Sequence, residues 1–278
     1  MVVDSHQHFW SLGMPWFDWP TPDLEPIYKD YAPADLRPLI EAAGVSKTVL
    51  VQAAPNLEET GFILDIAQET DFVAGVVGWI DLEQPAHLAD LERFADHPKF
   101  RGVRPMIQSI PDVNWMLRPA LRPCLMRVQQ LGLTFDALIK PPHLDAFIQF
   151  IDLYPDLPVV VDHGAKPEIA KGRAGFDAWA GRIAAVAARP QVFCKLSGLL
   201  TEAGDRNRRD DLLPFVEHLI EVFGPQRLMW GSDWPVVELA APYPDWFAQA
   251  KAFIARLSEA EQRLILGDVA RNFYRLRA

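Results

Sequence analysis

The chain contains very few cysteines. Its 278 residues include two, Cys124 and Cys194, with no paired spacing. Small secreted domains depend on dense disulfide frameworks, and two thiols cannot form one. We therefore expect a protein of a reducing compartment, the cytoplasm. Half of the residues are hydrophobic, which is enough for a substantial core.

The chain also lacks positive charge and long apolar runs. Lys and Arg number 27 against 37 Asp and Glu, so the net charge is −10. Without a basic run to neutralise phosphates, we expect no nucleic-acid partner. No uncharged apolar run approaches the ~18 residues of a membrane span, so we expect no membrane partner. No basic and apolar leader precedes the first predicted strand, so we expect no signal peptide.

A glycine-rich phosphate turn, which an open doubly wound sheet would need after an early strand, is also absent. Instead, short apolar strands alternate with amphipathic helices, as in a parallel sheet buried under helices. Eight such units in roughly 250 residues predict an α/β fold of the (β/α)₈ TIM-barrel type with extra C-terminal helices. We expect one domain over 1–278. The predicted strands are 1–10, 48–52, 73–82, 102–107, 133–139, 158–163, 192–197 and 227–233.

The predicted helices are 33–44, 58–70, 87–97, 119–132, 143–154, 175–189, 211–223, 243–257 and 258–271. The region 258–278 is expected to form a C-terminal helix that begins with a capping box of Ser258 and Glu261. Residues 11–32 contain four prolines and many aromatics, which predicts an irregular loop packed by its own rings. Such a loop is often a lid or a binding loop, and a cover over the bottom of the barrel is the alternative.

Two histidines lie two residues apart in the first predicted strand. Side chains at this spacing share one face of a strand, about 6–7 Å apart, so His6 and His8 should project together, with Asp4 on the same face. Such a pair could hold one cation or one substrate oxygen. An edge strand with two solvated histidines is the alternative interpretation.

Polar residues stand at the end of nearly every predicted strand, where the site of such a barrel is formed. Buried polar groups are costly unless they serve one another or a ligand. Besides the two histidines they are Gln52, Trp79, Asp81, Arg104, Lys140, Asp162, His163, Lys195, Ser197 and Asp233.

Among these residues, three histidines and one aspartate form a plausible metal-binding set: His6, His8, His163 and Asp233. Three nitrogens and one carboxylate suit Zn²⁺ or a similar cation with an open position for water. Asp233 could also take a proton from water. Taken singly, His163 could cap a strand and Asp233 could form a turn.

Four segments, in this order, resemble the amidohydrolase superfamily and within it the branch that opens sugar lactones. They are DSHQHFW (4–10), VDHGAKP (161–167), CKLSGL (194–199) and RLMWGSDWP (227–235). The resemblance covers essentially the whole chain and implies a distorted TIM barrel that hydrolyses an aldonolactone such as L-fucono-, L-rhamnono- or L-galactonolactone. It implies that His6, His8 and His163 are substrate-polarising or metal-binding imidazoles and that Asp233 is the general base.

The chain departs from the two-metal members of this superfamily, which carry a bridging Lys or Glu on the fourth strand and a second histidine on the fifth. Here the fourth strand offers Arg104, and the fifth, 133–139, contains no histidine. We therefore expect one divalent ion, zinc first, held by the four residues above. Some members of the resembling branch work without metal, so metal-free catalysis stays open.

The expected reaction is hydrolysis of the lactone ester. The carbonyl oxygen would face His6 and His8, or an ion that they hold, while Asp233 removes a proton from water. The ring oxygen would leave with a proton from Asp233 or His163. Side chains able to bind hydroxyls, the aldonate or a sugar face are the candidate substrate contacts: Gln52, Trp79, Arg104, Gln108, Lys166, Lys195 and Trp234.

Two other functions stay open. A superfamily hydrolase or decarboxylase of an aromatic or dicarboxylic substrate, such as a pyrone dicarboxylate lactone, would need several arginines at the strand ends, where only Arg104 stands. A non-catalytic barrel that binds sugar acids or a protein partner would not need Asp233 or the histidine pair. Helices on the barrel exterior could also form a homodimer.

Overall fold

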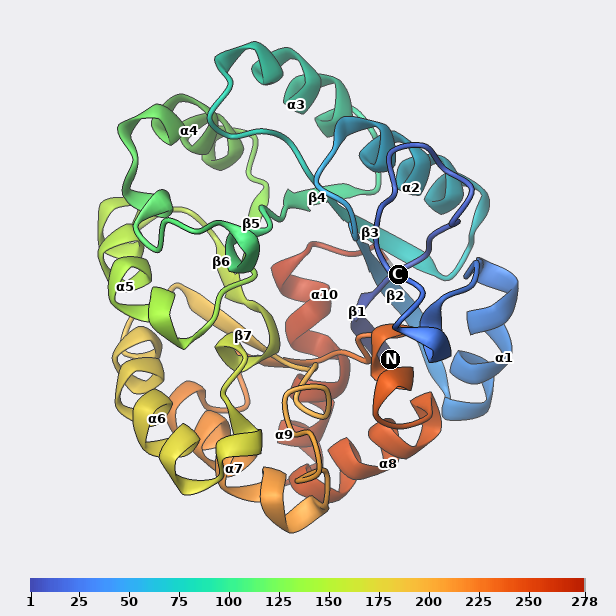
Figure 1. Ribbon diagram of the computed structural model, residues 1–278, viewed down its shortest axis with the longest axis vertical. Helices are drawn as coiled ribbons and strands as arrows, with labels where there is room; N and C mark the ends of the chain where they lie inside the picture. Colours follow the sequence, from blue (N-terminus) through green and yellow to red (C-terminus); the bar gives the residue numbers. More distant parts are fainter. Residues whose placement is uncertain (278) are drawn as a thin grey trace.

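The computed structural model describes residues 1–277 as a ring of strands surrounded by helices (Figure 1). The eight strands are parallel and hydrogen-bonded in sequence order. They are β1 (Val2–Gln7), β2 (Val45–Val51), β3 (Val73–Gly78), β4 (Phe100–Val103), β5 (Thr134–Ala137), β6 (Val159–Val161), β7 (Val192–Leu196) and β8 (Leu228–Trp230). The predicted TIM barrel is confirmed.

The ring closes between β1 and the residues that follow β8. The backbone N–H of His8 donates to the Trp234 carbonyl at 2.7 Å, and that of Asp233 donates to the His6 carbonyl at 2.8 Å. Barrel closure therefore brings the histidine pair and Asp233 together, although more than 220 residues separate them in the chain.

The main helices form close to their predicted bounds and cover the outside of the ring. None of the helices within residues 1–277 is both long enough and apolar enough to span a membrane. The helices are α1 (Pro33–Ala43), α2 (Leu57–Glu69), α3 (Leu88–Ala95), α4 (Arg122–Gln130), α5 (Leu144–Leu153), α6 (Arg173–Ala187), α7 (Arg209–Phe223), α8 (Tyr243–Ile254), α9 (Glu259–Arg263) and α10 (Val269–Phe273).

The C-terminal region is not the single helix that the sequence predicts. The capping box is confirmed, since Ser258 Oγ accepts from the Glu261 N–H and Glu261 returns a carboxylate oxygen to the Ser258 N–H. After α9, however, Leu264–Asp268 forms a π-helical turn, and α10 follows. At Gly267 a Cβ would lie 2.1 Å from the Met1 carbonyl, so only glycine lets this turn pass so close to β1.

Helix α10 packs across the base of the barrel, at the N-terminal ends of the strands. Its Val269 and Ala270, with Tyr274 just beyond it, are buried against interior strand residues such as Val3 and Val77. Figure 1 shows α10 near the middle of the ring, among the strands. The base of the barrel is therefore an apolar plug, and the mouth lies at the opposite end.

The segment 11–32 is irregular, as predicted, apart from one short 3₁₀ turn at Glu25–Ile27. Trp10 packs edge-on against Trp19 and against Tyr31, each with ring centroids 5.3 Å apart. The segment does not cover the bottom of the barrel, because Asp18 and Trp19 line the cavity at the mouth described below.

The expectation that Asp4 shares a face with His6 and His8 is wrong. Its carboxylate accepts from the Ser232 N–H at 2.8 Å and from the Tyr243 hydroxyl of α8 at 3.3 Å. The pairing of β1 with β2 shifts register between Asp4 and Gln7. An irregularity of this kind interrupts the two-residue alternation of side chains, so the sequence spacing alone misplaces Asp4.

Candidate active site

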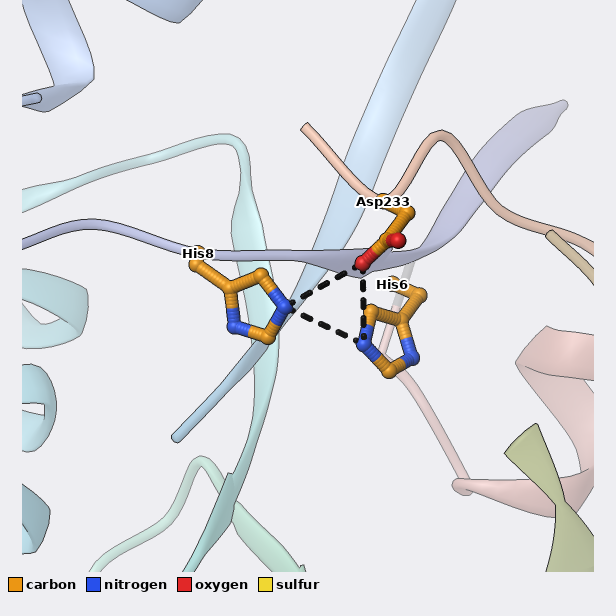
Figure 2. Close-up of side chains that lie close together, drawn as sticks. All are labelled: His6, His8 and Asp233. Atoms are coloured by element: carbon orange, nitrogen blue, oxygen red, sulfur yellow. Dashed lines mark hydrogen bonds and ion pairs between the residues drawn. The ribbon is translucent and has the colours of Figure 1, made fainter. Parts of the chain in front are cut away.

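Three histidines and one aspartate meet at the mouth of the barrel, all at most 3% exposed. The Nε2 atoms of His6 and His8 are 3.2 Å apart. Asp233 Oδ1 lies 3.6 Å from Nε2 of His6, 3.4 Å from that of His8 and 3.8 Å from that of His163. Figure 2 shows His6 of β1 and His8, just beyond β1, turned toward Asp233, which follows β8.

Tight turns place His163 two residues after β6 and Asp233 three residues after β8. Both residues have positive φ, 53° and 59°, a backbone conformation that L-residues rarely adopt. These turns begin where the sequence predicts continuing strand, and β6 and β8 end at Val161 and Trp230. At Gly198 (φ 61°) a Cβ would lie 2.5 Å from the His163 ring, so glycine lets the segment after β7 approach that ring. Strained turns of this kind cluster at functional sites.

The three imidazoles are neutral near pH 7. Burial lowers the pKa of His163 to about 4, and burial is also the largest cause that lowers the pKa of His6 and of His8. Burial alone would raise the pKa of Asp233, but the neighbouring His163, His8 and His6 outweigh it and hold that pKa below its ordinary value. The site therefore presents a carboxylate among neutral rings.

Hydrogen bonds to fixed partners orient each ring. His8 Nδ1 lies 2.7 Å from the Val51 carbonyl, which can only accept, so this nitrogen carries the proton and Nε2 offers a lone pair. His163 Nδ1 lies 2.8 Å from Ser197 Oγ. Such partners lock the orientation of an imidazole and set which nitrogen faces a ligand.

Arg104, just beyond β4, supplies a buried permanent cation. Its guanidinium donates to the Gln52 carbonyl and lies 3.4 Å from Asp162 Oδ2. Its Nη1 also lies 3.2 Å from His6 Nε2. A guanidinium in this position can stabilise negative charge that develops on a substrate at the site.

A cavity of about 580 Å³ opens onto this group, a size typical of a small-molecule site. Its wall comes from the aromatic segment and from the loops after several strands. The residues that line it are His8, Asp18, Trp19, Ala53, Pro55, Arg104, Met106, Gln108, Ser109, Leu138, Lys140, His163, Lys166, Glu202, Asp233 and Val236.

Among the residues that the sequence proposes, His8, His163, Asp233, Arg104, Gln108 and Lys166 line the cavity. His6 lies behind them and is fully buried. Four proposed substrate contacts also fall outside the cavity wall: Gln52, Trp79, Lys195 and Trp234.

Each of these four has another partner. Gln52 Nε2 donates to the Arg104 carbonyl, and the Trp79 ring lies 6.3 Å from that of His87. Lys195 is fully buried against Asp136 and Asp162. Trp234 donates to Glu238, and its ring packs against Tyr31.

Sequence reasoning did not single out several polar residues around the site. Asp18 and Glu202 line the cavity, and Glu59 is buried with its pKa raised by burial to about 8. Asp136 is the one charged residue of β5, and a charge in a strand predicted to be buried is a signal that could have identified it. Tyr274 gives no signal, because nothing in the sequence shows that α10 packs inside the ring.

The donor atoms fit a divalent cation on distance. Ligands at 2.0–2.1 Å from a tetrahedral Zn²⁺ lie about 3.3–3.4 Å apart. The nitrogens of His6 and His8 and the Asp233 oxygen are separated by 3.2–3.6 Å, with His163 Nε2 3.8 Å from that oxygen. A cation there would bind against the positive charge of Arg104, which touches the same nitrogen of His6.

The histidines and the aspartate thus lie at the C-terminal ends of the strands of a (β/α)₈ barrel, where enzymes of this fold carry their active sites. The family model described as amidohydrolase matches residues 3–276, and the chain belongs to the amidohydrolase family.

Curated relatives and a solved structure resemble the chain over its whole length. An L-fucono-1,5-lactonase of Burkholderia ambifaria is 43% identical over 278 residues, covering 99% of this chain and 95% of the relative. An L-fucono-1,5-lactonase of Burkholderia multivorans is 35% identical, with 99% and 96% covered. The crystal structure of an amidohydrolase from Burkholderia multivorans with bound zinc superposes with a TM-score of 0.93 at 34% identity and covers all of both chains.

Proposed function

We propose that the protein is a hydrolase that opens a sugar-acid lactone, L-fucono-1,5-lactone first, to the free aldonate. The observation that carries this proposal is the ionised Asp233, set among neutral imidazoles beside Arg104 at a cavity of about 580 Å³. The two curated relatives named L-fucono-1,5-lactonase support the choice of substrate.

The charge of the cavity suits a neutral, polyhydroxylated substrate. Arg104, Lys140 and Lys166 bring positive charge to the wall, and Asp18, Glu202 and Asp233 bring negative charge. Lys166 is also paired with Glu202 at 2.9 Å. A dicarboxylic substrate would need unpaired cations, so this balance favours an uncharged lactone over a pyrone dicarboxylate.

Asp233 is proposed to accept the proton of the attacking water. It is ionised near neutral pH and lines the cavity, which are the two requirements for a general base. The lone pair on His8 Nε2 lies 3.4 Å from the same carboxylate oxygen and offers the water a second acceptor. The water is thereby oriented as it attacks the lactone carbonyl carbon.

Arg104 and His163 are proposed to stabilise the oxyanion, the role that the sequence assigned to His6 and His8. Both line the cavity, whereas His6 does not. With the Ser197 hydroxyl proton donated to Nδ1, the ring proton of His163 is on Nε2 and faces the cavity. A neutral imidazole can act as an electrophile in this way. When the adduct collapses, the ring oxygen leaves with the proton held by Asp233.

We propose Zn²⁺ as the divalent ion that His6, His8 and Asp233 would hold, with His163 as the fourth ligand and the zinc-bound relative as support. When bound, such an ion polarises the carbonyl and lowers the pKa of its water. The roles given above describe the protein without this ion, because an ion on Nε2 of His8 and His163 would occupy the lone pair of the first and replace the proton of the second. Trp19, Gln108 and Lys166 are the proposed contacts to the sugar ring and its hydroxyls.

A proton-release assay over a panel of aldonolactones tests the proposal, since each ring opening yields an acid. We expect turnover of L-fucono-1,5-lactone and of related L-sugar lactones, and none of a pyrone dicarboxylate lactone. Turnover of the pyrone alone would replace this proposal by the dicarboxylate alternative. No hydrolysis of any lactone, with aldonate bound, would favour a binding protein. Elemental analysis of the active preparation measures the metal.

A further inference from the structure

A row of fully buried polar side chains crosses the barrel interior from the base to the mouth. The Tyr274 hydroxyl donates to Asp136 Oδ2 at 2.5 Å, and Lys195 Nζ donates to the same oxygen at 2.7 Å. Lys195 Nζ in turn lies 3.1 Å from His6 Nδ1. All four residues are 0% exposed. The plug at the base is thus connected by hydrogen bonds to a histidine of the site.

The ammonium group of Lys195 has all three of its hydrogens in use. Its acceptors are Asp136 Oδ2 at 2.7 Å, Asp162 Oδ1 at 3.0 Å and His6 Nδ1 at 3.1 Å. A lysine ammonium can only donate, so His6 Nδ1 must accept. In the protein without a bound ion, the single ring proton of neutral His6 is therefore on Nε2, which lies 3.6 Å from Asp233 Oδ1. Arg104 Nη1, 3.2 Å from the same nitrogen, then directs its hydrogen to Asp162 Oδ2 instead.

This row is a costly way to fill a barrel. Neighbouring interior positions such as Val49, Val77 and Val160 are apolar and pack against α10 without any charge. Burying charges costs several kcal/mol per ion, and an apolar core of similar volume is often as stable. A role in stability alone does not account for the row, whereas a role in orienting His6 does.

We propose that Tyr274 is a positioning residue of the active site, which acts through Asp136 and Lys195 to hold His6 in the tautomer protonated at Nε2. The Tyr274 hydroxyl fixes Asp136, whose other oxygen is held by Thr134 Oγ at 3.1 Å. Asp136 fixes the ammonium, and the ammonium fixes the ring. The Nε2–H of His6 then faces Asp233 Oδ1, which leaves the lone pair of His8 Nε2 free to accept from the water. The kinetic part of this proposal rests on the proposed lactonase function.

Tyr274→Phe is the variant that tests the proposal, because the ring still fills the base and only the hydroxyl is lost. We expect kcat to fall about tenfold, while KM stays within about twofold, since His6 does not line the cavity. Lys195→Met is less useful, because it would leave Asp136 and Asp162 buried without their cation and could prevent folding.

Tyr243→Phe is the matched control. The Tyr243 hydroxyl is also buried and also donates to a buried carboxylate, that of Asp4, at 3.3 Å. Asp4 accepts from the His6 backbone N–H at 3.2 Å, but no side-chain hydrogen bond links this pair to the His6 ring. We expect a similar loss of thermal stability in both variants and a kcat close to that of the wild type in Tyr243→Phe. A wild-type kcat in Tyr274→Phe, or an equal fall in both variants, overturns the proposal.

The ¹⁵N chemical shifts of the His6 ring give a readout that needs no substrate. In protein freed of metal with a chelator, we expect the wild type to carry the proton on Nε2 and Tyr274→Phe to show an increased share of the Nδ1-protonated form, with Tyr243→Phe unchanged. A wild-type ring protonated on Nδ1 would overturn the proposal. If the wild type hydrolyses no lactone, the proposed function fails, and these spectra still decide the role of Tyr274.

Discussion

The mouth and the base of the barrel are built from different kinds of residue. At the mouth the strands end in tight turns, and His163 and Asp233 hold strained backbone conformations around polar side chains. At the base, Val3 and Val77 pack against Val269 of α10 in an apolar plug. The difference indicates that apolar packing at the base stabilises the fold and offsets the free-energy cost of the strained and buried polar groups at the mouth. Variants at the two ends should therefore affect different measurements.

The largest effect is expected at the mouth, from Asp233→Asn. The amide cannot accept the proton of water, so kcat for lactone hydrolysis should fall by about 10³–10⁴-fold. Steady-state kinetics and a thermal unfolding curve of the same preparation check this, and we expect the fold to be kept. An Asp233→Asn variant with unimpaired kcat would remove Asp233 from the mechanism.

Arg104→Met should come next, with a fall in kcat/KM of about 10²–10³-fold, because a cation at the oxyanion is lost. The variant also leaves the Gln52 carbonyl without this donor, so some stability should be lost as well. Arg104→Lys keeps the charge but not the planar fork and should recover only part of the rate. Equal activity of Arg104→Met and the wild type would contradict the oxyanion role.

The fold was more predictable from the sequence than the details of the site. The alternation of apolar strands and amphipathic helices indicated eight units, because each strand had to be buried on both faces. The sequence predicts that β6 and β8 end at 163 and 233, whereas they end at Val161 and Trp230, because the turns at His163 and Asp233 use the residues that follow the apolar runs. Local patterns do not show where tertiary contacts impose a turn.

For the site, the sequence identifies the residues that carry the chemistry, but it does not show in which direction each side chain points. His6 and Lys195 belong to the buried row rather than to the cavity wall, and the bulge in β1 turned Asp4 toward α8. The contribution of Tyr274 depends on α10 packing inside the ring, a contact between the two ends of the chain. Spacing within one strand carries no information about such contacts.

The third prediction concerns pH and a buried carboxyl behind the mouth. Burial raises the pKa of Glu59 from an ordinary 4.5 to about 8, so the folded protein keeps a proton that the unfolded chain has lost. Stability from this group is thus present below pH 4.5 and is lost as pH rises toward 8, by on the order of 3 kcal/mol at pH 7.

Glu59→Gln removes this titration and keeps an acceptor for the Ala53 N–H, which Glu59 Oε1 binds at 2.6 Å. The unfolding free energy of the wild type should therefore decrease relative to that of Glu59→Gln between pH 5 and pH 8. Urea unfolding at several pH values measures the difference. Parallel curves for the two proteins over this range would show that Glu59 does not titrate there.

The smallest effect is expected at the base, from Val269→Ala in α10. Removing two buried methyl groups should lower the unfolding free energy by about 1–2 kcal/mol and Tm by a few degrees. The kcat should stay within about twofold of the wild type, because Val269 belongs to the apolar plug and not to the polar row that begins at Tyr274. Comparison with Tyr274→Phe sharpens the contrast between the two ends, since Tyr274 lies only five residues after Val269, just beyond the end of α10. A large fall in kcat for Val269→Ala would mean that any loosening of α10 reaches the site, and the division between a stabilising base and a catalytic mouth would not hold.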